Sequence, residues 1–255
     1  MVTARNSEIL SDVTQCVTFF TRIPLPTMAS KRSFAEALWA APVAGALVGL
    51  VTSVVLLASL SLGLSPFVAA ILGVGASILV TGALHEDGFA DVADGFWGGR
   101  TPDRVIEIMR DSRIGSYGTL ALILSVALRW SAWATIVSQG EPAFIIVASV
   151  AIHSASRAIL PAFAAHVPPA SGCGLSASIG AILPIRVAIA LLLGAASLLA
   201  VGPAYAVVSV LLLGLTFFAM KHLCIAKIGG QTGDVLGALQ QACEIILLLA
   251  LAANL

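Results

Sequence analysis

The chain has 255 residues, of which 59% are hydrophobic and only 10% are charged, and its mean hydropathy is +1.03. Soluble domains contain about 45–50% apolar residues, so this composition excludes a soluble domain and indicates one integral membrane unit, residues 1–255. The basic and acidic side chains cancel to a formal net charge of zero, which offers no basic surface for nucleic acid.

The N-terminal segment, residues 8–26, predicts a helix that lies in the membrane interface. Apolar side chains recur in it at helical spacing: Ile9, Val13, Cys16, Val17 and Phe20. An amphipathic helix of this kind buries its apolar face at the headgroup boundary, and Pro24 and Pro26 end the pattern. We expect Arg22 to contact lipid headgroups, with the substrate as the alternative.

Seven apolar stretches approach the length of about 20 residues that crossing a bilayer requires. They are residues 37–60, 66–84, 117–137, 142–163, 185–201, 204–220 and 238–253. The last three are shorter, and the break at Gly202 and Pro203 predicts either a tight turn or a kink in a re-entrant pair. The predicted fold is an all-α, polytopic transmembrane helix bundle of about seven spans.

Basic residues gather on one side of these spans. With the N-terminus in the cytoplasm, nearly all Lys and Arg residues fall in cytoplasmic segments, and the opposite loops near Ser61, Gln139 and Gly202 contain none. Cytoplasmic loops carry such an excess of positive charge. We therefore expect a multi-pass protein whose N-terminus, acidic motif and loops near Gly172 and Gly229 face the cytoplasm.

One motif concentrates acid in a chain where acid is scarce: residues 85–95, with the sequence HEDGFADVADG. In a helix, Asp87, Asp91 and Asp94 fall at i, i+4 and i+7 and project from one face. Three neighbouring carboxylates repel each other unless a cation lies among them. Oxygen ligands without nearby Cys suit Mg²⁺ or Mn²⁺, which a few carboxylates and substrate phosphates hold. The motif predicts such a metal site, with Glu86 as a further ligand.

His85 directly precedes the acidic residues. A neutral imidazole near pH 7 can act as a base, and it can equally serve as a ligand or as a hydrogen-bond partner that orients Asp91. The residues alone leave these three roles open.

The segment after the motif predicts a short cytoplasmic helix from Pro102 to about Ser112. Thr101 suits the N-cap and Pro102 the first helical position, and Gly115 and Gly118 are expected to end the helix.

Arginine crowds this segment, and its planar guanidinium matches phosphate oxygens. We interpret Arg104 and Glu107 as an ordinary surface ion pair at helical spacing. The candidates for substrate binding stand directly before a glycine turn: Arg110, Asp111, Ser112 and Arg113.

A glycine-rich loop, residues 227–234 (KIGGQTGD), precedes the last apolar stretch. Glycines let backbone N–H groups approach a phosphate, and a helix N-terminus beyond them favours an anion. The loop lacks Walker spacing, so an ordinary turn with Asp234 at the helix start is the alternative. The candidate binding residues are Gly229, Gly230, Thr232, Gly233 and Asp234.

Four titratable residues fall at apolar depth: Arg129, His153, Arg157 and Glu244. Charges inside a membrane pair with one another by default, so one interpretation of Arg129 and Arg157 is a structural ion pair with an acid on another helix. Arg157 is also a candidate substrate-binding residue, because it falls near the cytoplasmic end of its span and could snorkel toward the site. His153 is expected to be a hydrogen-bonded interior residue, and Glu244 requires a partner or a function.

Four separate motifs, in order along the chain, resemble the cobalamin synthase family of adenosylcobinamide-GDP ribazoletransferases. They are residues 20–24 (FTRIP), 84–95 (LHEDGFADVADG), 108–115 (IMRDSRIG) and 229–234 (GGQTGD). Ser156 with Arg157, and residues 172–176, also resemble that family's pattern. Arg110 stands where the pattern has Lys, and Cys173 interrupts the turn.

The resemblance implies an Mg²⁺-dependent enzyme of the bacterial inner membrane. It would join adenosylcobinamide-GDP to α-ribazole or its 5′-phosphate and release GMP, the last joining step of coenzyme B12 assembly. Such transfers need positioning and charge neutralisation above all. Membrane lipid surrounds such a protein, and a homo-oligomer is left open.

We combine the resemblance with the motifs in one hypothesis for the site. Asp87, Asp91 and Asp94 would hold one or two Mg²⁺ ions, and Asp94 or His85 would take the ribose hydroxyl proton. Arg110 or Arg113, with the backbone of residues 229–233, would balance charge on the departing GMP.

Two other functions are weighed against this one. A CDP-alcohol phosphotransferase also places Asp residues on membrane helices, but its motif has an Ala-Arg pair and acids four apart, whereas here the acids fall at intervals of four and three. A secondary transporter would use Arg129, His153 and Arg157 along a pathway, but transport sites lie near the membrane midplane, and this acidic motif lies at its edge.

Overall fold

The computed structural model describes residues 2–26, 32–170 and 180–255, and within them the fold is all-helical. The helices are α1 (Val2–Phe20), α2 (Phe34–Ala37), η1 (Leu38–Ala40), α3 (Ala41–Ser61), α4 (Pro66–Thr81), α5 (Leu84–Gly98), α6 (Pro102–Met109), α7 (Ser116–Gln139), α8 (Pro142–Ala158), α9 (Leu160–His166), α11 (Pro184–Val201), α12 (Pro203–Ile228) and α13 (Gly233–Ala252). The one β-bridge among these residues joins Pro169 to Gln231.

Six helical stretches of the described chain are long and apolar enough to cross a membrane, and the pair α4–α5 supplies a seventh if it counts as one span. The six are Phe34–Ser61, Ser116–Gln139, Pro142–His166, Pro184–Val201, Pro203–Ile228 and Gly233–Ala252. The prediction of about seven spans is confirmed, and the chain is a multi-pass membrane protein. The break at Gly202 separates two full-length helices, so it is a turn between spans.

The second predicted span ends earlier than expected. α4 stops at Thr81 because Gly82 and Ala83 adopt left-handed conformations, with φ values of 64° and 58°. A left-handed residue at a helix C-cap satisfies the last carbonyls, and the N–H of Ala83 donates to the carbonyl of Ile78 at 2.9 Å. The chain then turns by 91° into α5, so α5 runs across the direction of α4 instead of continuing it.

Glycine allows the central helices α3 and α8 to pack closely. A Cβ atom at Gly45 would lie 2.1 Å from the carbonyl oxygen of His153, and one at Gly49 would lie 2.5 Å from that of Ser149. Small residues four apart permit this approach in membrane helices. Ser149 Oγ also donates to the carbonyl of Gly49 at 2.8 Å, so a side chain of α8 is bonded to the backbone of α3.

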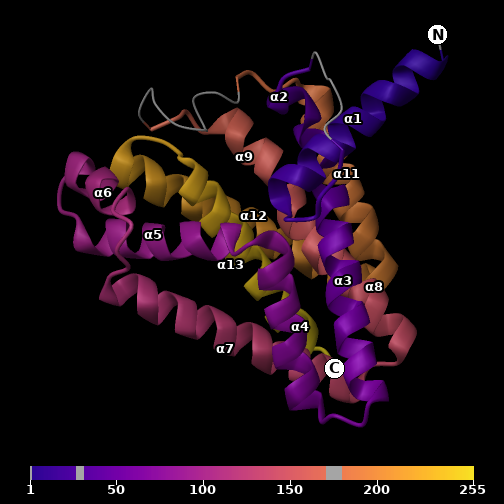
Figure 1. Cartoon of the computed structure of the whole chain (residues 1–255). Helices are drawn as coiled ribbons and strands as arrows, with labels where there is room; N and C mark the ends of the chain where they lie inside the picture. Colours follow the sequence, from indigo (N-terminus) through magenta and orange to yellow (C-terminus); the bar gives the residue numbers. More distant parts are fainter. Residues whose placement is uncertain (1, 27–31, 171–179) are drawn as a thin grey trace.

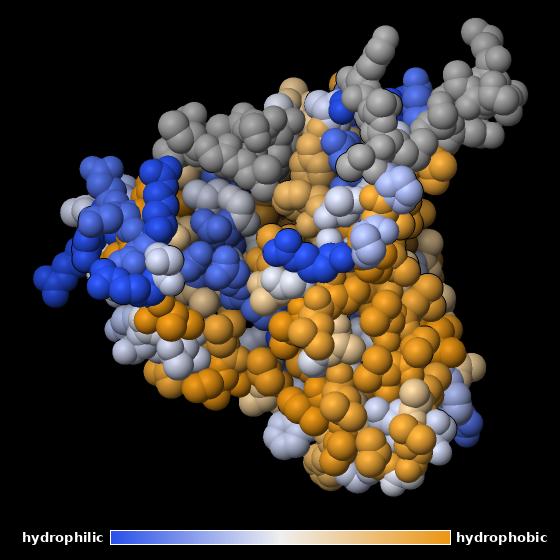
Figure 2. Space-filling model, in the orientation of Figure 1, coloured by the Kyte–Doolittle hydropathy of each residue, from blue (hydrophilic) through white to orange (hydrophobic). Residues whose placement is uncertain are grey.

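The two ends of the bundle differ in polarity. The N-terminus lies at one end and the C-terminus at the other, and α5 runs across the bundle beside α6 and the α12–α13 loop (Figure 1). On the face shown in Figure 2, hydrophilic side chains gather over α5 and α6, and apolar side chains cover the opposite end. The acidic helix thus lies at the polar end of a hydrocarbon-facing bundle.

Three predicted helix boundaries differ from those in the structure. The short helix α6 ends at Met109, three residues before the expected Ser112. Gly118 was expected to end that helix, but it lies inside α7, which begins at Ser116. The N-terminal helix α1 ends at Phe20, before the prolines that were expected to stop it.

Candidate active site

The acidic helix α5 crosses α13 at a point where neither helix carries a side chain. A Cβ atom at Gly88 would lie 2.8 Å from the carbonyl oxygen of Asp234 and 2.9 Å from its Cα, and one at Gly237 would lie 3.5 Å from the Cα of His85. The close crossing brings the start of α13 against the acidic face of α5. Asp234 therefore joins the carboxylates of the HEDGFADVADG motif.

Three carboxylates gather there, and we name Asp87, Asp91 and Asp234 the acid patch. Asp87 is exposed, and Asp91 and Asp234 are partly buried. Burial of Asp91, together with the negative charges of Asp87, Asp234 and Asp94, raises the pKa of Asp91 from 3.8 to about 7. Burial is the largest cause of this shift, and the neighbouring negative charges add to it by opposing ionisation of Asp91.

The donor atoms of the acid patch suit a hard divalent cation, although the side chains are not drawn together around one. No group of three His, Cys, Asp or Glu side chains in the described part of the chain converges enough to hold a metal ion. Mg²⁺ retains several waters and needs one or two carboxylates with substrate phosphates. The acid patch meets that smaller requirement.

Asp94, the third acid of the stripe, has other partners. Its Oδ2 accepts a hydrogen bond from the backbone N–H of Gly115 at 2.7 Å, and its Oδ1 accepts one from Gly118 at 2.9 Å. The residue is 9% exposed. Both of its carboxylate oxygens are thus engaged by the start of α7.

Glu86 faces the bundle instead of the acid patch. Its Oε1 lies 2.8 Å from Nη1 of Arg129, and both side chains are buried. The successive positions 86 and 87 point to different sides of α5, so an acid beside the stripe in sequence contributes to the interior.

His85 is buried at the same corner. Its ring stacks on that of Phe20, with centroids 5.9 Å apart and planes 5° from parallel. Burial, followed by the charge of Arg157, keeps the pKa of His85 well below its usual value. The imidazole is therefore neutral, and at 2% exposure it has little access to solvent.

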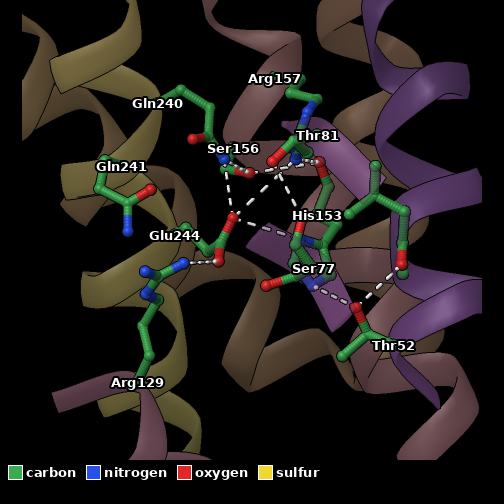
Figure 3. A network of polar contacts seen from close by, with 12 residues as sticks. Thr52, Ser77, Thr81, Arg129, His153, Ser156, Arg157, Gln240, Gln241 and Glu244 are labelled. Atoms are coloured by element: carbon green, nitrogen blue, oxygen red, sulfur yellow. Dashed lines mark hydrogen bonds and ion pairs between the residues drawn. The ribbon is translucent and has the colours of Figure 1, made fainter. Parts of the chain in front are cut away.

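A buried polar network lies beneath α5, centred on Glu244 of α13 (Figure 3). Glu244 lies 3.4 Å from Arg129 and 3.2 Å from Nδ1 of His153, and it accepts a hydrogen bond from Gln240 at 2.8 Å. Nη1 of Arg157 lies 3.9 Å from the same carboxylate. The ion pairs expected in one interpretation of the two arginines and the interior role of His153 are confirmed, and the binding role of Arg157 stays a prediction.

The network balances its charges. Two guanidinium groups, of Arg129 and Arg157, face two carboxylates, of Glu86 and Glu244. Gln241 lies 2.8 Å from Ser125 Oγ, and its amide oxygen accepts from Arg129 when turned toward that side chain. Intramembrane charges are costly without such pairing, so the network ties α5, α7, α8 and α13 together.

The arginine-rich segment lies at the surface near the acid patch. Arg104 and Glu107 form the predicted surface pair at 2.7 Å. Arg113 pairs with Asp111, also at 2.7 Å, while its side chain stays 87% exposed. Arg110 ends α6, is exposed, and lies within electrostatic range of Asp234.

The glycine-rich loop is shaped by its neighbours. Gly229 has a left-handed φ of 74° and ends α12. A Cβ atom at Gly230 would lie 2.3 Å from the carbonyl oxygen of Pro168, and the N–H of Gln231 donates to that carbonyl at 2.8 Å. Part of the loop backbone is thus paired with residues 168–170. The turn at residues 172–176 lies outside the described residues.

The start of α13 has the turn that one alternative predicted for this loop. Thr232 caps the helix by accepting from the N–H of Val235 at 3.3 Å, and its hydroxyl donates to Oδ2 of Asp234, also at 3.3 Å. Asp234 is a helix-start residue, as one alternative expected, and it also belongs to the acid patch. Ser112 is exposed and Gly233 is the first residue of the helix.

One further contact at the polar end of the bundle was not predicted from the sequence. Lys227, in the last turn of α12, donates from Nζ to the carbonyl of Phe96 near the end of α5. A cation suits the C-terminal end of a helix, but only the fold identifies the helix that receives it.

The fold and the site define a class of protein: a polytopic helical membrane protein with an acid patch on a helix that crosses the polar end of its bundle. Comparison of the sequence with known families identifies the group within this class. The chain matches the cobalamin-5-phosphate synthase family over residues 12–252 and belongs to it.

Relatives support the same assignment over nearly the whole chain. The protein called adenosylcobinamide-GDP ribazoletransferase in Mesorhizobium japonicum is 49% identical, covering 95% of this chain and 93% of the relative. The protein of the same name in Bradyrhizobium diazoefficiens is 50% identical, covering 98% and 96%, and that in Azorhizobium caulinodans is 43% identical, covering 96% of each. No solved structure matches the chain.

Proposed function

We propose that this chain is an adenosylcobinamide-GDP ribazoletransferase that performs the final joining step of cobalamin assembly. The observation that carries the proposal is identity of about half the residues with relatives of that name over nearly the full length of both chains. A ribose hydroxyl of α-ribazole, or of its 5′-phosphate, attacks the cobinamide-bearing phosphorus of adenosylcobinamide-GDP. The bond from that phosphorus to GMP breaks, the hydroxyl loses its proton, and adenosylcobalamin or its 5′-phosphate forms.

The acid patch suits this chemistry. Phosphoryl transfer requires positioning and neutralisation of negative charge more than covalent participation by the protein. Asp87, Asp91 and Asp234 would hold Mg²⁺, which supplies charge neutralisation on the diphosphate when bound. The raised pKa of Asp91 supports a cation at this position, because a nearby positive charge relieves the repulsion among the three carboxylates.

The residues around the acid patch would bind the substrate and hold α5 in position. Arg110 lies within electrostatic range of Asp234, where its guanidinium would balance negative charge on the nucleotide. The ion pair of Glu86 with Arg129 holds the first turn of α5 in place. His85, buried beneath Phe20, and Asp94, engaged by two backbone amides, have no free side-chain face for a substrate hydroxyl, so we assign the proton to neither.

We place the acid patch on the cytoplasmic side of a bacterial inner membrane, with the N-terminus in the cytoplasm. The distribution of Lys and Arg supports this orientation, since the basic segments lie at the same end as α5. The variants Ser112→Cys and Ser61→Cys, at two exposed positions and in a background without the native cysteines, test it. Only the thiol introduced at position 112 should react with an impermeant reagent supplied from the cytoplasmic face. Labelling at position 61 alone from that face would reverse the orientation.

One assay tests the activity. Purified protein with Mg²⁺, adenosylcobinamide-GDP and α-ribazole should release GMP, and a chelator should stop the release. CDP-diacylglycerol should give no CMP, and liposomes should show no substrate flux without GMP. Absence of GMP from the wild-type protein would overturn the proposal.

A substitution in the acid patch tests the metal. Asp87→Asn should lower turnover by about a hundredfold or more, on the scale of other lost electrostatic contacts in active sites, and should raise the Mg²⁺ concentration needed for half-maximal rate. Asp103→Asn, on the exposed face of α6, is the matched control and should behave like wild type. Full activity of Asp87→Asn would remove the metal from this patch.

A further inference from the structure

The helix α7 begins without a capping side chain of its own. Its N-cap residue is Gly115, in an extended conformation with φ −94° and ψ −176°, and no side chain of the cap accepts a hydrogen bond. The first N–H groups of any helix need acceptors from outside the helix. Other helices in the described part of the chain meet that need with their own N-cap hydroxyl, among them Ser65 for α4, Thr101 for α6 and Thr232 for α13.

Asp94 of α5 supplies the hydrogen-bond acceptors that the N-terminus of α7 lacks. Its two oxygens accept from the N–H groups of Gly115 and Gly118, at 2.7 and 2.9 Å. A Cβ atom at Gly115 would lie 2.4 Å from Oδ1 of Asp94, and one at Gly118 would lie 2.3 Å from Oδ2. Both glycines therefore leave the space that the carboxylate occupies. A negative charge at a helix N-terminus is also stabilising.

We propose that Asp94 is a positioning residue, which caps α7 from α5 and thereby fixes the arginine-bearing segment 110–114 beside the acid patch. The proposal rests on the proposed function for its effect on catalysis. Only the residues 110–114 separate the end of α6 from the cap at Gly115. Holding Gly115 against α5 therefore sets where Arg110 stands relative to Asp234.

This role separates Asp94 from the acids that precede it. Asp87 is exposed, whereas Asp94 is 9% exposed and already accepts two charge-assisted hydrogen bonds. The residues 87, 91 and 94 share a helical stripe, but the last one lies where the stripe reaches the start of α7. A metal role and a capping role make opposite predictions for a second-site substitution.

The experiment replaces the acceptor on α5 with an N-cap hydroxyl on α7 itself. Asp94→Ala removes the acceptor. Gly115→Ser alone introduces a Cβ that collides with the Asp94 carboxylate. In the double variant the collision is absent, and the introduced hydroxyl stands at the N-cap, where serine is a strongly preferred residue. The single variants should each lose about tenfold in turnover, on the scale of a small misplacement of binding groups, and the double variant should recover to within about threefold.

Two readouts distinguish capping from metal binding. In Asp94→Ala the Mg²⁺ concentration for half-maximal rate should stay within about twofold of wild type, whereas Asp87→Asn raises it. Amide hydrogen exchange at Gly118 and Thr119 should accelerate by about fivefold in Asp94→Ala, as expected for loss of an N-cap, and return toward wild type in the double variant. Asp94→Asn, which keeps one acceptor oxygen, should be intermediate.

The outcomes separate the two proposals. A tenfold higher Mg²⁺ requirement in Asp94→Ala that Gly115→Ser does not restore would overturn the capping role and make Asp94 a metal ligand. Unchanged exchange at the start of α7 would overturn it as well. If the wild-type protein releases no GMP, the proposed function fails, while the exchange measurement still decides the cap.

Discussion

Replacing Gly88 by alanine should disrupt the crossing of α5 and α13 and, with it, the acid patch. The added Cβ would lie 2.8 Å from the carbonyl oxygen of Asp234, whereas ordinary contacts begin at 3.4 Å. The difference between these two distances requires the helices to separate by about 0.6 Å. Overpacking of this kind costs about 1–3 kcal/mol.

The same separation should also affect catalysis. Asp87 and Asp91 lie on α5 and Asp234 lies on α13, so separation of the helices changes the distance across the acid patch. A misplacement approaching 1 Å lowers rates by up to about a hundredfold. We expect Gly88→Ala to reduce GMP release by roughly tenfold to a hundredfold while the protein still inserts and folds.

Gly237→Ala is the matched control on the opposite helix. Its Cβ would meet no atom closer than 3.5 Å, and alanine is favoured over glycine within a helix by about 1 kcal/mol. The assay compares turnover and thermal unfolding of both variants in the same detergent. Wild-type turnover in Gly88→Ala, or equal losses in the two variants, would refute the close crossing as the element that assembles the patch.

Three further predictions concern charge. Because the proton on Asp91 must leave before a cation can bind, Mg²⁺ at limiting concentration should support more activity as pH rises through about 7; a rate that falls over this range would contradict this. In metal-free protein the same raised pKa means that the folded state holds the proton more tightly, so stability, followed as the melting temperature, should decline as pH rises from about 4 to 7. Arg129→Met should destabilise the protein by about 3–5 kcal/mol, because it leaves the buried charge of Glu86 without its partner and removes one partner of Glu244. Arg104→Met, in an exposed pair, should leave the melting temperature nearly unchanged, and equal melting temperatures for the two variants would be inconsistent with the network.

The spans and the intramembrane ion pairs were predictable because unpaired backbone groups and unpaired charges are both energetically costly inside a membrane. An apolar stretch of membrane length has few alternatives to a spanning helix, and a charge at apolar depth must find a partner. The sequence therefore indicated that Arg129 and Arg157 would pair with acids. It did not indicate which acids, because the choice of Glu86 and Glu244 depends on how α5, α7, α8 and α13 pack.

The 91° turn before α5 was not predicted. The apolar stretch 66–84 continues past Thr81, and only the left-handed conformations of Gly82 and Ala83 end the helix there. Glycine permits such a conformation without requiring it. Alanine at a positive φ is unfavourable by about 1–2 kcal/mol, so tertiary contacts must maintain the corner. One such contact is the N–H of Arg22, which donates to the carbonyl of Val80 at 2.7 Å.

The acids of α5 have different partners because successive residues of a helix point in different directions. Glu86 turns toward the bundle and meets Arg129, Asp91 lies within electrostatic range of Asp87 and Asp234, and Asp94 meets α7. Helical periodicity alone grouped Asp87, Asp91 and Asp94, because it describes one helix without its neighbours. The neighbours of α5 are indicated by the glycines at 88, 115 and 118. At each of them a backbone or a carboxylate comes too close for a side chain. A helix this rich in acid is stable because two of its carboxylates have fixed partners, which leaves the repulsion concentrated at the acid patch, where a cation can relieve it.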